Sequence, residues 1–380
     1  ILAVYGHSSG KKYASRSLGQ RSGTLEDVVM QVKFWKNKRV LVTGHTGFKG
    51  GWLSLCLHRI GANLCGYSLD KTKENEFYSK VFSRGFVGDE IIADINDYNE
   101  LLKCVKNFRP EIIFHFAAQP LVRYSYLNPV ETFKSNIMGV VNLFEVVKSS
   151  NLEPVIINIT TDKVYENNEM IWAYRENEKL GGNDPYSASK ACSEIITNSY
   201  MKSFFKDTSV KIATARAGNV VGGGDMSKDR LVPDYFRALI RNEKIFLRNP
   251  KASRPWQHVL EPIHGYIKLA EKLFQNDGKS YIGSWNFGPI EDSLEVGEII
   301  NKLSYISKGP AFELDMNSNP HESQSLMLDS AKARKYLNWK PKLNIDETLS
   351  LTYDWFIKSI EEQEMLDFSQ SQILDYQKHD

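Results

Sequence analysis

The fold of this chain is decided by one stretch, Arg39-Val-Leu-Val-Thr-Gly44-His-Thr-Gly47-Phe-Lys-Gly50. Its first five residues form a short β-branched, apolar run, which predicts a buried strand. The spaced glycines predict a tight turn, and the apolar periodicity from Trp52 to Ile60 predicts a helix that ends at Gly61. Strand, glycine turn and helix in this order are typical of a loop that holds a pyrophosphate at a helix N-terminus. The alternative is a purely structural glycine-rich turn.

The strand predicted for residues 63–69 indicates which dinucleotide this loop would hold. It ends at Asp70, twenty residues after Gly50. A carboxylate there suits the ribose hydroxyls of NAD and would repel the 2′-phosphate of NADP. We therefore expect NAD as the cofactor, with Asp94, at the end of the next strand, near the adenine. The turn itself is expected to contribute Gly44, Thr46, Gly47, Phe48, Lys49 and Gly50.

Strands and helices continue to alternate as far as Ala217. The pattern predicts strands at 112–118, 155–160 and 211–217, with helices at 129–150 and after Pro185. Repeated βα units of this kind predict an α/β fold, a Rossmann-type doubly wound parallel sheet with a smaller C-terminal α/β domain for the substrate. We divide the chain into an N-terminal extension outside the fold (1–33), an NAD-binding domain with the catalytic residues (34–217), a mainly substrate-binding domain (218–360) and a loosely ordered polar tail (361–380).

Composition excludes several classes of protein. The 380 residues carry a net charge of +2 with both signs interspersed, which gives no surface for nucleic acid or for an anionic membrane. No apolar segment approaches the ~20 residues of a membrane span, and the N-terminus lacks the apolar core of a secretory signal. Four cysteines lack metal-ligand spacing, and three of them lie in apolar runs. We expect reduced, buried thiols, no metal site and a cytoplasmic location.

The chemistry is expected between Ile159 and Lys190. Thr160, Thr161, Asp162 and Lys163 follow a predicted strand, and the carboxyl edge of a parallel sheet is where ligands bind. Tyr186 and Lys190 are four residues apart, so a helix places both side chains on one face. An ammonium group beside a phenol favours the phenolate, which makes a general base from tyrosine. The alternatives are a solvated helix face for Tyr186 and Lys190 and a surface ion pair for Asp162 and Lys163.

These motifs, in this order, resemble the extended short-chain dehydrogenase/reductase superfamily. Within it the chain is similar to the CDP-glucose 4,6-dehydratases over about residues 35–356. The subfamily rests mainly on Asp162-Lys163, because dTDP-glucose and GDP-mannose dehydratases have Asp-Glu there and UDP-galactose 4-epimerases lack an acid/base pair. The similar phrases lie at 43–50, 115–123, 160–167, 216–225, 254–262, 285–289, 321–322 and 329–339.

The resemblance implies NAD-dependent dehydration of CDP-D-glucose to CDP-4-dehydro-6-deoxy-D-glucose. Tyr186, assisted by Lys190, takes the proton of the sugar 4-hydroxyl as C4 is oxidised, and Thr160 hydrogen-bonds the same oxygen. Water then leaves from C5 and C6 with Asp162 as acid and Lys163 as base, and the hydride returns to C6. The further cofactor contacts implied are Ile95, Ala117, Ala118, Gln119 and Asn136, beside Tyr186 and Lys190.

The role of Lys163 has two alternatives. In water Asp⁻ and Lys⁺ are favoured over the neutral pair by about 6.5 pKa units, or roughly 9 kcal/mol. We therefore expect Lys163 to act either as a base or as a cation that stabilises the C5 enolate. The alternatives to a CDP-glucose dehydratase are an epimerase or a dehydratase on another nucleotide sugar, and a non-catalytic NAD-binding regulator.

The C-terminal third is expected to bind the sugar nucleotide. The resemblance places Asn219 and Arg254 on its phosphates, since the planar guanidinium grips phosphate at two points. Arg230 is a further candidate, with a local ion pair to Asp as the alternative, and His321-Glu322 replaces the Arg-x-Gly-Asp of epimerases. The superfamily also implies a homodimer through the helices 130–147 and 188–205. Its deoxysugar products typically enter bacterial surface polysaccharide such as the lipopolysaccharide O-antigen.

Overall fold

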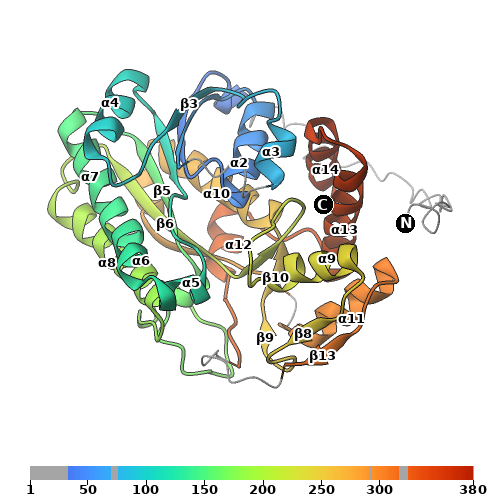
Figure 1. Cartoon of the computed structure of the whole chain (residues 1–380). Coiled ribbons are helices and arrows are strands. Elements are labelled where there is room, and N and C mark those ends of the chain that lie inside the picture. Colours follow the sequence, from blue (N-terminus) through green and yellow to red (C-terminus); the bar gives the residue numbers. More distant parts are fainter. Residues whose placement is uncertain (1–32, 70–75, 291–292, 316–323, 380) are drawn as a thin grey trace.

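A computed structural model describes residues 33–69, 76–290, 293–315 and 324–379. Its centre is a parallel sheet of seven strands in the order β11-β6-β5-β4-β1-β2-β3. Figure 1 labels β3, β5 and β6 of this sheet. The strand order reverses between β1 and β4, so the crevice at the carboxyl ends of these two strands is the switch point of the sheet. The bounds are β1 Arg39–Thr43, β2 Asn63–Ser68, β3 Asp89–Ile92, β4 Ile112–His115, β5 Val155–Ile159, β6 Lys211–Ala217 and β11 Gly283–Phe287. The predicted doubly wound sheet is confirmed.

Helices cover both faces of this sheet because the strands are apolar on both sides. On β1, Val40 and Val42 join one core cluster and Leu41 joins the other, as the alternation of side chains along a strand requires. The first face carries α2 (Phe48–Arg59) and α10 (Leu260–Phe274). The second carries α4 (Tyr98–Phe108), α7 (Gly139–Ser150) and α8 (Pro185–Ser203).

The predicted helix over 129–150 is confirmed but is not uniform. It begins as α6 (Pro129–Phe133), widens into a single π-helical turn over Lys134–Met138, and continues as α7. Asn136 lies inside the π turn. Such turns interrupt the regular backbone ladder and are frequent at functional sites.

The second half of the chain forms smaller units beside the carboxyl edge of the sheet. Three two-stranded pairs, β7 with β10, β8 with β13 and β9 with β12, pack with helices α9, α11 and α13 around their own apolar cluster. The bounds are β7 Asn219–Val221, β8 Ile245–Leu247, β9 Ser253–Arg254, β10 Trp256–His258, β12 Leu294–Glu295, β13 Phe312–Leu314, α9 Leu231–Arg241, α11 Val296–Ser307 and α13 Ile345–Glu361. The shorter helices are α3 Glu76–Val81, α5 Val122–Leu127, α12 Ala331–Leu337 and the 3-10 turns at Asp162–Val164 and Gly278–Tyr281.

The expectation of a loosely ordered tail from 361 to 380 is wrong. Residues Leu366–Lys378 form helix α14 (Figure 1). Its Ile373 and Tyr376 side chains are buried in the main core. The Tyr376 hydroxyl donates to Glu261 Oε2 at 2.8 Å. Glutamine and serine make the segment polar on average, but its few apolar residues lie on one helical face and find a partner in α10.

We expect Tyr376→Phe to lower the free energy of unfolding by about 1.5–3 kcal/mol, the range for a hydrogen bond to a charged group. The substitution keeps the ring packed and removes only the donor to Glu261. Urea denaturation of both proteins measures the difference, and Ser371→Ala, on the exposed side of the same helix, is the control. Equal stability of the Tyr376→Phe and wild-type proteins would mean that α14 does not dock as described.

Cysteines and possible membrane segments complete the description. Cys56, Cys65 and Cys104 are buried free thiols, as expected, and Cys192 is half-buried. Over the described ranges, no helix is long and apolar enough to cross a membrane. Within the same residues, no cluster of His, Cys, Asp and Glu has the geometry to hold a metal ion.

Candidate active site

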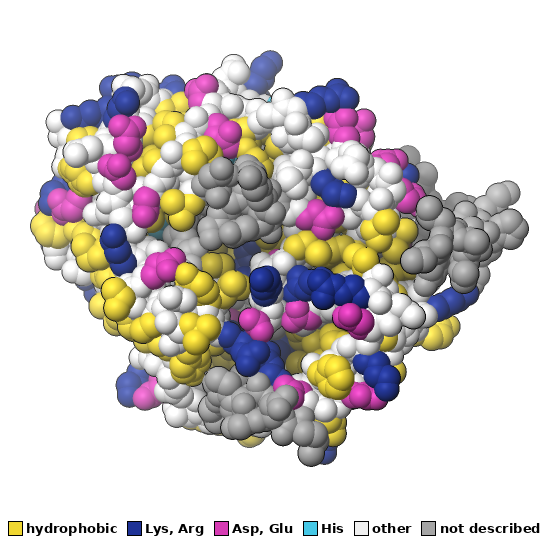
Figure 2. All heavy atoms as spheres, viewed as in Figure 1, with side chains coloured by type: hydrophobic (Ala, Val, Ile, Leu, Met, Phe, Trp, Pro, Cys, Tyr) yellow, Lys and Arg dark blue, Asp and Glu magenta, His cyan; other side chains and the backbone are white. Residues whose placement is uncertain are grey.

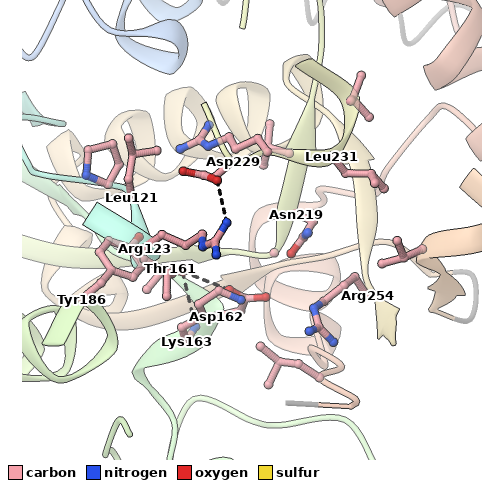
Figure 3. Close-up of a pocket in the computed structure, with 18 of the residues that line it drawn as sticks. Leu121, Arg123, Thr161, Asp162, Lys163, Tyr186, Asn219, Asp229, Leu231 and Arg254 are labelled. Carbon is pink, nitrogen blue, oxygen red and sulfur yellow. Dashed lines mark hydrogen bonds and ion pairs between the residues drawn. The ribbon is translucent and has the colours of Figure 1, made fainter. Parts of the chain in front are cut away.

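A cavity of about 590 Å³ lies at the carboxyl edge of the sheet, between the two halves of the chain. Its size suits a small organic ligand. From the sheet side it is lined by Lys49, Thr161, Asp162, Lys163 and Tyr186, and from the other side by Asn219, Asp225, Arg230, Arg248 and Arg254. Figure 3 shows the side chains of Asp162, Asn219 and Arg254 grouped around one space, and Figure 2 shows Lys and Arg side chains gathered around the hollow on this face.

The glycine turn lies at the switch point with the geometry that the sequence predicts. Gly44 has a φ of +76°, and a Cβ there would lie 2.7 Å from the backbone nitrogen of Ala117. A Cβ on Gly50 would lie 2.2 Å from the carbonyl oxygen of Gly44. Only glycine permits both the left-handed turn and the close approach of α2. The turn therefore presents a bare backbone beside the N-terminus of α2, where Gly47 is the N-cap.

The other residues expected to contact the cofactor lie along the same edge. Thr46 is bonded to Ser68 and to the Leu69 carbonyl, which ties the turn to the end of β2. Asn136 accepts from the Gln119 backbone at 2.8 Å and donates to Ser189 of α8 at 2.8 Å. The π turn thus fixes the loop after β4 against α8. Ala117 and Ala118 follow β4, Asp94 and Ile95 follow β3, and Asp70 and His321-Glu322 lie outside the described residues.

Tyr186 and Lys190 lie on the first turns of α8, as predicted. The helix begins at Pro185, and the Asp184 side chain caps it by accepting from Ser187 N at 2.9 Å. Lys190 Nζ donates to the Ile159 carbonyl at 3.0 Å. Both side chains are buried, so the alternative of a solvated helix face is wrong.

Electrostatics at this pair differ from the expectation. Burial raises the pKa of Tyr186 to about 12, while a hydrogen bond from Thr161 and the charge of Arg230 act in the opposite direction. Burial also lowers the pKa of Lys190 to about 8, assisted by the charge of Lys49 and opposed by Glu194. The prediction that the neighbouring Lys190 ammonium lowers the pKa of Tyr186 is therefore not met in the protein alone, because burial has the largest effect and the charge that opposes it is that of Arg230.

Thr160 is not the threonine that faces Tyr186, which corrects the sequence-based assignment. Its hydroxyl donates to Glu194 Oε1 at 2.6 Å. Thr161 instead hydrogen-bonds Tyr186 and donates to Asp162 Oδ1 at 3.0 Å. Successive side chains leave a strand end in opposite directions, so only one of the two adjacent threonines reaches this part of the pocket.

Asp162 and Lys163 do not form a surface ion pair. Asp162 is 2% exposed and Lys163 is half-buried, and the structure records no ion pair between them across the described residues. Asp162 Oδ2 is buried and has no hydrogen-bond partner among those residues. A buried carboxylate oxygen without a partner is costly unless a ligand satisfies it. Asp162 is therefore placed to contact a polar group that enters the pocket.

The expected phosphate ligands line the opposite wall. Asn219 begins β7, and Arg254, which is 8% exposed, lies in β9. Arg230 pairs with Asp225 Oδ2 at 2.8 Å, so the local ion pair exists while the guanidinium also lines the pocket. Across the mouth, Arg123 of α5 pairs with Asp229 at 3.0 Å (Figure 3).

The family model described as GDP-mannose 4,6-dehydratase matches residues 41–352. The chain belongs to this family. A relative that is also described as a 4,6-dehydratase, CDP-glucose 4,6-dehydratase of Salmonella typhimurium, is 44% identical over 90% of this chain and 97% of its own length. As a family member the chain is an enzyme of the 4,6-dehydratase type, a hydro-lyase.

Solved structures agree with the fold of this family. UDP-glucose 4-epimerase of Thermotoga maritima, solved with UDP-glucose, is 22% identical with a TM-score of 0.74 and covers 85% of this chain and 99% of its own. UDP-glucose 4-epimerase of Thermus thermophilus, solved with NAD, is 24% identical with a TM-score of 0.73 and covers 84% of this chain and 99% of its own. At this identity the likeness establishes a shared Rossmann-type architecture.

Sequence reasoning missed several residues at the site of this dehydratase-family member. Thr161 follows the predicted strand but was given no role. Its position next to Thr160 is the signal that either threonine could face Tyr186. Arg123, Lys228 and Arg248 also line the pocket. They come from three separate segments, so only the tertiary fold brings them together. The only sequence signal for these three residues is that each is basic and lies near a loop predicted at the carboxyl edge of the sheet.

Proposed function

We propose that this protein converts CDP-D-glucose to CDP-4-dehydro-6-deoxy-D-glucose by NAD-dependent dehydration. The observation that carries the proposal is Asp162-Lys163 on the floor of the pocket, directly after Thr161 and facing the same space as Tyr186. Asp-Lys is the pair that the CDP-glucose enzymes have at these positions. The 44% identity to a CDP-glucose 4,6-dehydratase supports the same nucleotide.

The residues present fit NAD as the cofactor. The bare glycine turn at the start of α2 would hold the pyrophosphate, with Thr46, Phe48 and Lys49 around it. Ala117, Ala118, Gln119 and Asn136 would border the dinucleotide where β4 ends, and Asp94 with Ile95 the adenosine half. NAD, when bound, supplies the oxidant for C4 and the reductant for C6, so the overall reaction is redox-neutral. We assign residues 34–217 together with β11 to NAD binding and catalysis, and residues 218–360 mainly to substrate binding.

In the first step Tyr186 takes the proton of the sugar 4-hydroxyl. With a pKa of about 12, Tyr186 carries its proton at neutral pH, so little of the phenolate that acts as the base is present. The hydrogen bond with Thr161 and the positive charge of Arg230 both favour the phenolate. Lys190 lies on the next turn of α8. Thr161, rather than Thr160, is therefore the threonine that we assign to the 4-oxygen.

In the second step water leaves across C5 and C6. The 4-ketone acidifies the C5 proton. Lys163 either removes this proton or stabilises the resulting enolate with its positive charge. Asp162 gives a proton to the departing 6-hydroxyl through the oxygen that lacks a protein partner.

Replacing Lys163 with methionine tests the second step. We expect water loss to fall by about 10²–10⁴-fold, the usual contribution of general acid–base catalysis, and exchange of the C5 proton with solvent deuterium to fall with it. NMR of the sugar in D2O measures the exchange. The control is Lys179→Met, which removes an exposed lysine paired with Glu166. Near-normal C5 exchange in Lys163→Met would exclude Lys163 both as base and as enolate stabiliser.

The substrate itself is tested by a panel of nucleotide sugars. The purified protein is incubated with CDP-, dTDP-, UDP- and GDP-hexoses and NAD, and each is followed by mass spectrometry. The proposal predicts loss of one water from CDP-glucose alone, without net accumulation of reduced cofactor. Water loss from a different nucleotide would correct the base. Interconversion of glucose and galactose without water loss would indicate a 4-epimerase.

We also propose that the protein is a homodimer in the cytoplasm. The side of the molecule formed by α5, α6, the π turn and α8 exposes large apolar side chains, which Figure 2 shows as yellow atoms on that side. Such a patch on a polar surface favours a protein partner. Its members are Leu127, Val130, Phe133, Met138, Ile195 and Phe204, with Leu127 81% and Val130 79% exposed. The product, a 4-keto-6-deoxy sugar nucleotide, suits deoxysugar synthesis for surface polysaccharide such as O-antigen.

A further inference from the structure

A fully bonded, buried carboxylate lies directly behind the catalytic pocket. Glu194 of α8 is 4% exposed and forms a two-point ion pair with Arg216 of β6, with 2.9 Å between Nε and Oε1 and between Nη2 and Oε2. Its oxygens also accept from Thr160 and Thr214, both at 2.6 Å, and from Ser284 at 3.0 Å. The mechanism above uses none of these groups.

The network holds the end of β5 against α8 at two successive points. Lys190 donates to the carbonyl of Ile159, the last residue of β5, at 3.0 Å. Glu194, one turn further along α8, accepts from the side chain of the next residue, Thr160. The residues that follow at once are Thr161 and Asp162, which enter the pocket beside Tyr186 (Figure 3).

We propose that Glu194 is a positioning residue that sets where Thr161 and Asp162 stand relative to Tyr186. The base Tyr186 acts at the 4-hydroxyl and the acid Asp162 acts at the 6-hydroxyl of one sugar, so their separation must be fixed. Tyr186, Lys190 and Glu194 recur every four residues and lie on one face of α8. The helix that carries the base therefore also grips the strand end that carries the acid. The proposal rests on the function proposed above.

The anchoring of Glu194 makes this grip rigid. Arg216 also donates to the Tyr165 hydroxyl at 2.7 Å and to Ser284 at 2.9 Å, so its remaining donors are occupied as well. The charge of Arg216 holds the pKa of Glu194 below its usual range against burial, which raises it. Glu194 is thus an ionised acceptor, and charge-assisted hydrogen bonds such as that from Thr160 are the strong kind.

Two threonines of this network make a matched test. Thr160→Val and Thr214→Val each delete one 2.6 Å hydrogen bond to the same carboxylate and leave the Glu194–Arg216 pair intact. Thr214 lies inside β6, away from the pocket-lining residues. We expect similar falls in melting temperature for both. Only Thr160→Val should lower kcat, by about ten- to a hundredfold with KM within about twofold, because small misplacements of reacting groups cost rates of this size.

A paired substitution separates this role from a direct contact of Thr160 with substrate. Glu194→Met/Arg216→Met replaces the buried ion pair by apolar side chains of similar length, an exchange that proteins often tolerate. This variant should lose kcat to the same extent as Thr160→Val. Adding Thr160→Val to it should change kcat by less than about twofold, because both changes break the same contact.

The assays use whichever nucleotide sugar of the panel the wild-type protein turns over. If CDP-glucose is inert and another sugar nucleotide reacts, the proposed substrate is wrong, and the positioning role is still measured because Tyr186 serves either reaction. Equal kcat for Thr160→Val and Thr214→Val would overturn the positioning role. The positioning role would also be overturned if the falls in kcat caused by Thr160→Val and by Glu194→Met/Arg216→Met multiplied in the combined variant.

Discussion

Tyr186→Phe is expected to lower kcat for water loss from CDP-glucose by about 10²–10⁴-fold, the range for removal of a general acid–base group. The ring is 8% exposed and stays packed, so only the hydroxyl is lost. Because the 4-ketone does not form without this base, exchange of the C5 proton with solvent deuterium should fall in parallel. Mass spectrometry measures water loss, and NMR in D2O measures exchange.

The matched control is Tyr200→Phe on the same helix. Its hydroxyl donates to Glu145 Oε1 at 2.9 Å, away from the residues that line the pocket. We expect kcat of this variant within about twofold of wild type, since surface substitutions away from a site have small effects. If Tyr186→Phe also kept kcat within that range, another group would have to be the base at the 4-hydroxyl.

Asp162→Asn is expected to have the second large effect, on elimination alone. Asparagine has the same shape but cannot donate an acidic proton to the 6-hydroxyl. Water loss should fall by about 10²–10⁴-fold. The 4-ketone can still form, so C5 exchange into D2O should continue and reduced cofactor should accumulate, as followed by its near-ultraviolet absorbance.

Contrast with Lys163→Met makes the test specific. Lys163→Met should block both exchange and elimination, whereas Asp162→Asn should block elimination only. The two residues are adjacent in the chain and border the same cavity, so a general disturbance of the site would give both variants one phenotype. Identical phenotypes would therefore refute the division of labour between acid and base.

Much of the fold follows from periodicity and glycine spacing. The strands β1 to β6 were predicted within a few residues, because most of them are buried on both faces and their apolar runs are continuous. The seventh strand could not be placed in this way. β11 pairs with β6 in parallel although more than a whole βα unit of the second half separates them in sequence. Such pairing depends on tertiary structure, which local patterns do not encode.

Sequence reasoning placed Thr160 to Lys163 and Tyr186 at one edge of the sheet, and all of them line the pocket. It did not distinguish Thr160 from Thr161. Which of two adjacent side chains faces a pocket depends on the register of β5 between β4 and β6. It also depends on the hydrogen-bond partner that lies on the opposite side of the strand. Here that partner is Glu194, thirty-four residues away in sequence and anchored by Arg216. The pKa of Tyr186 was misjudged for a related reason, because burial is a property of the folded site and outweighs the neighbouring charge.

The ends of the chain show the same limit of sequence reasoning. The polar tail forms α14 because Tyr376 finds Glu261 in α10 and Ile373 finds the main core. Composition averaged over a twenty-residue segment hides a few apolar positions on one face of a helix. The expectation for residues 1–33 as an extension outside the fold concerns a stretch of which all but the last residue lie outside the described part of the chain.

The most direct test of the proposed dehydration uses CDP-glucose labelled with deuterium at C4. The proposed reaction predicts a product that has lost one water and retains the deuterium, now in the methyl group at C6 by NMR. This outcome requires oxidation at C4, elimination and return of the same hydrogen within one active site. Deuterium recovered at C4 of an epimerised sugar without water loss, or lost to solvent from a dehydrated product, would contradict it.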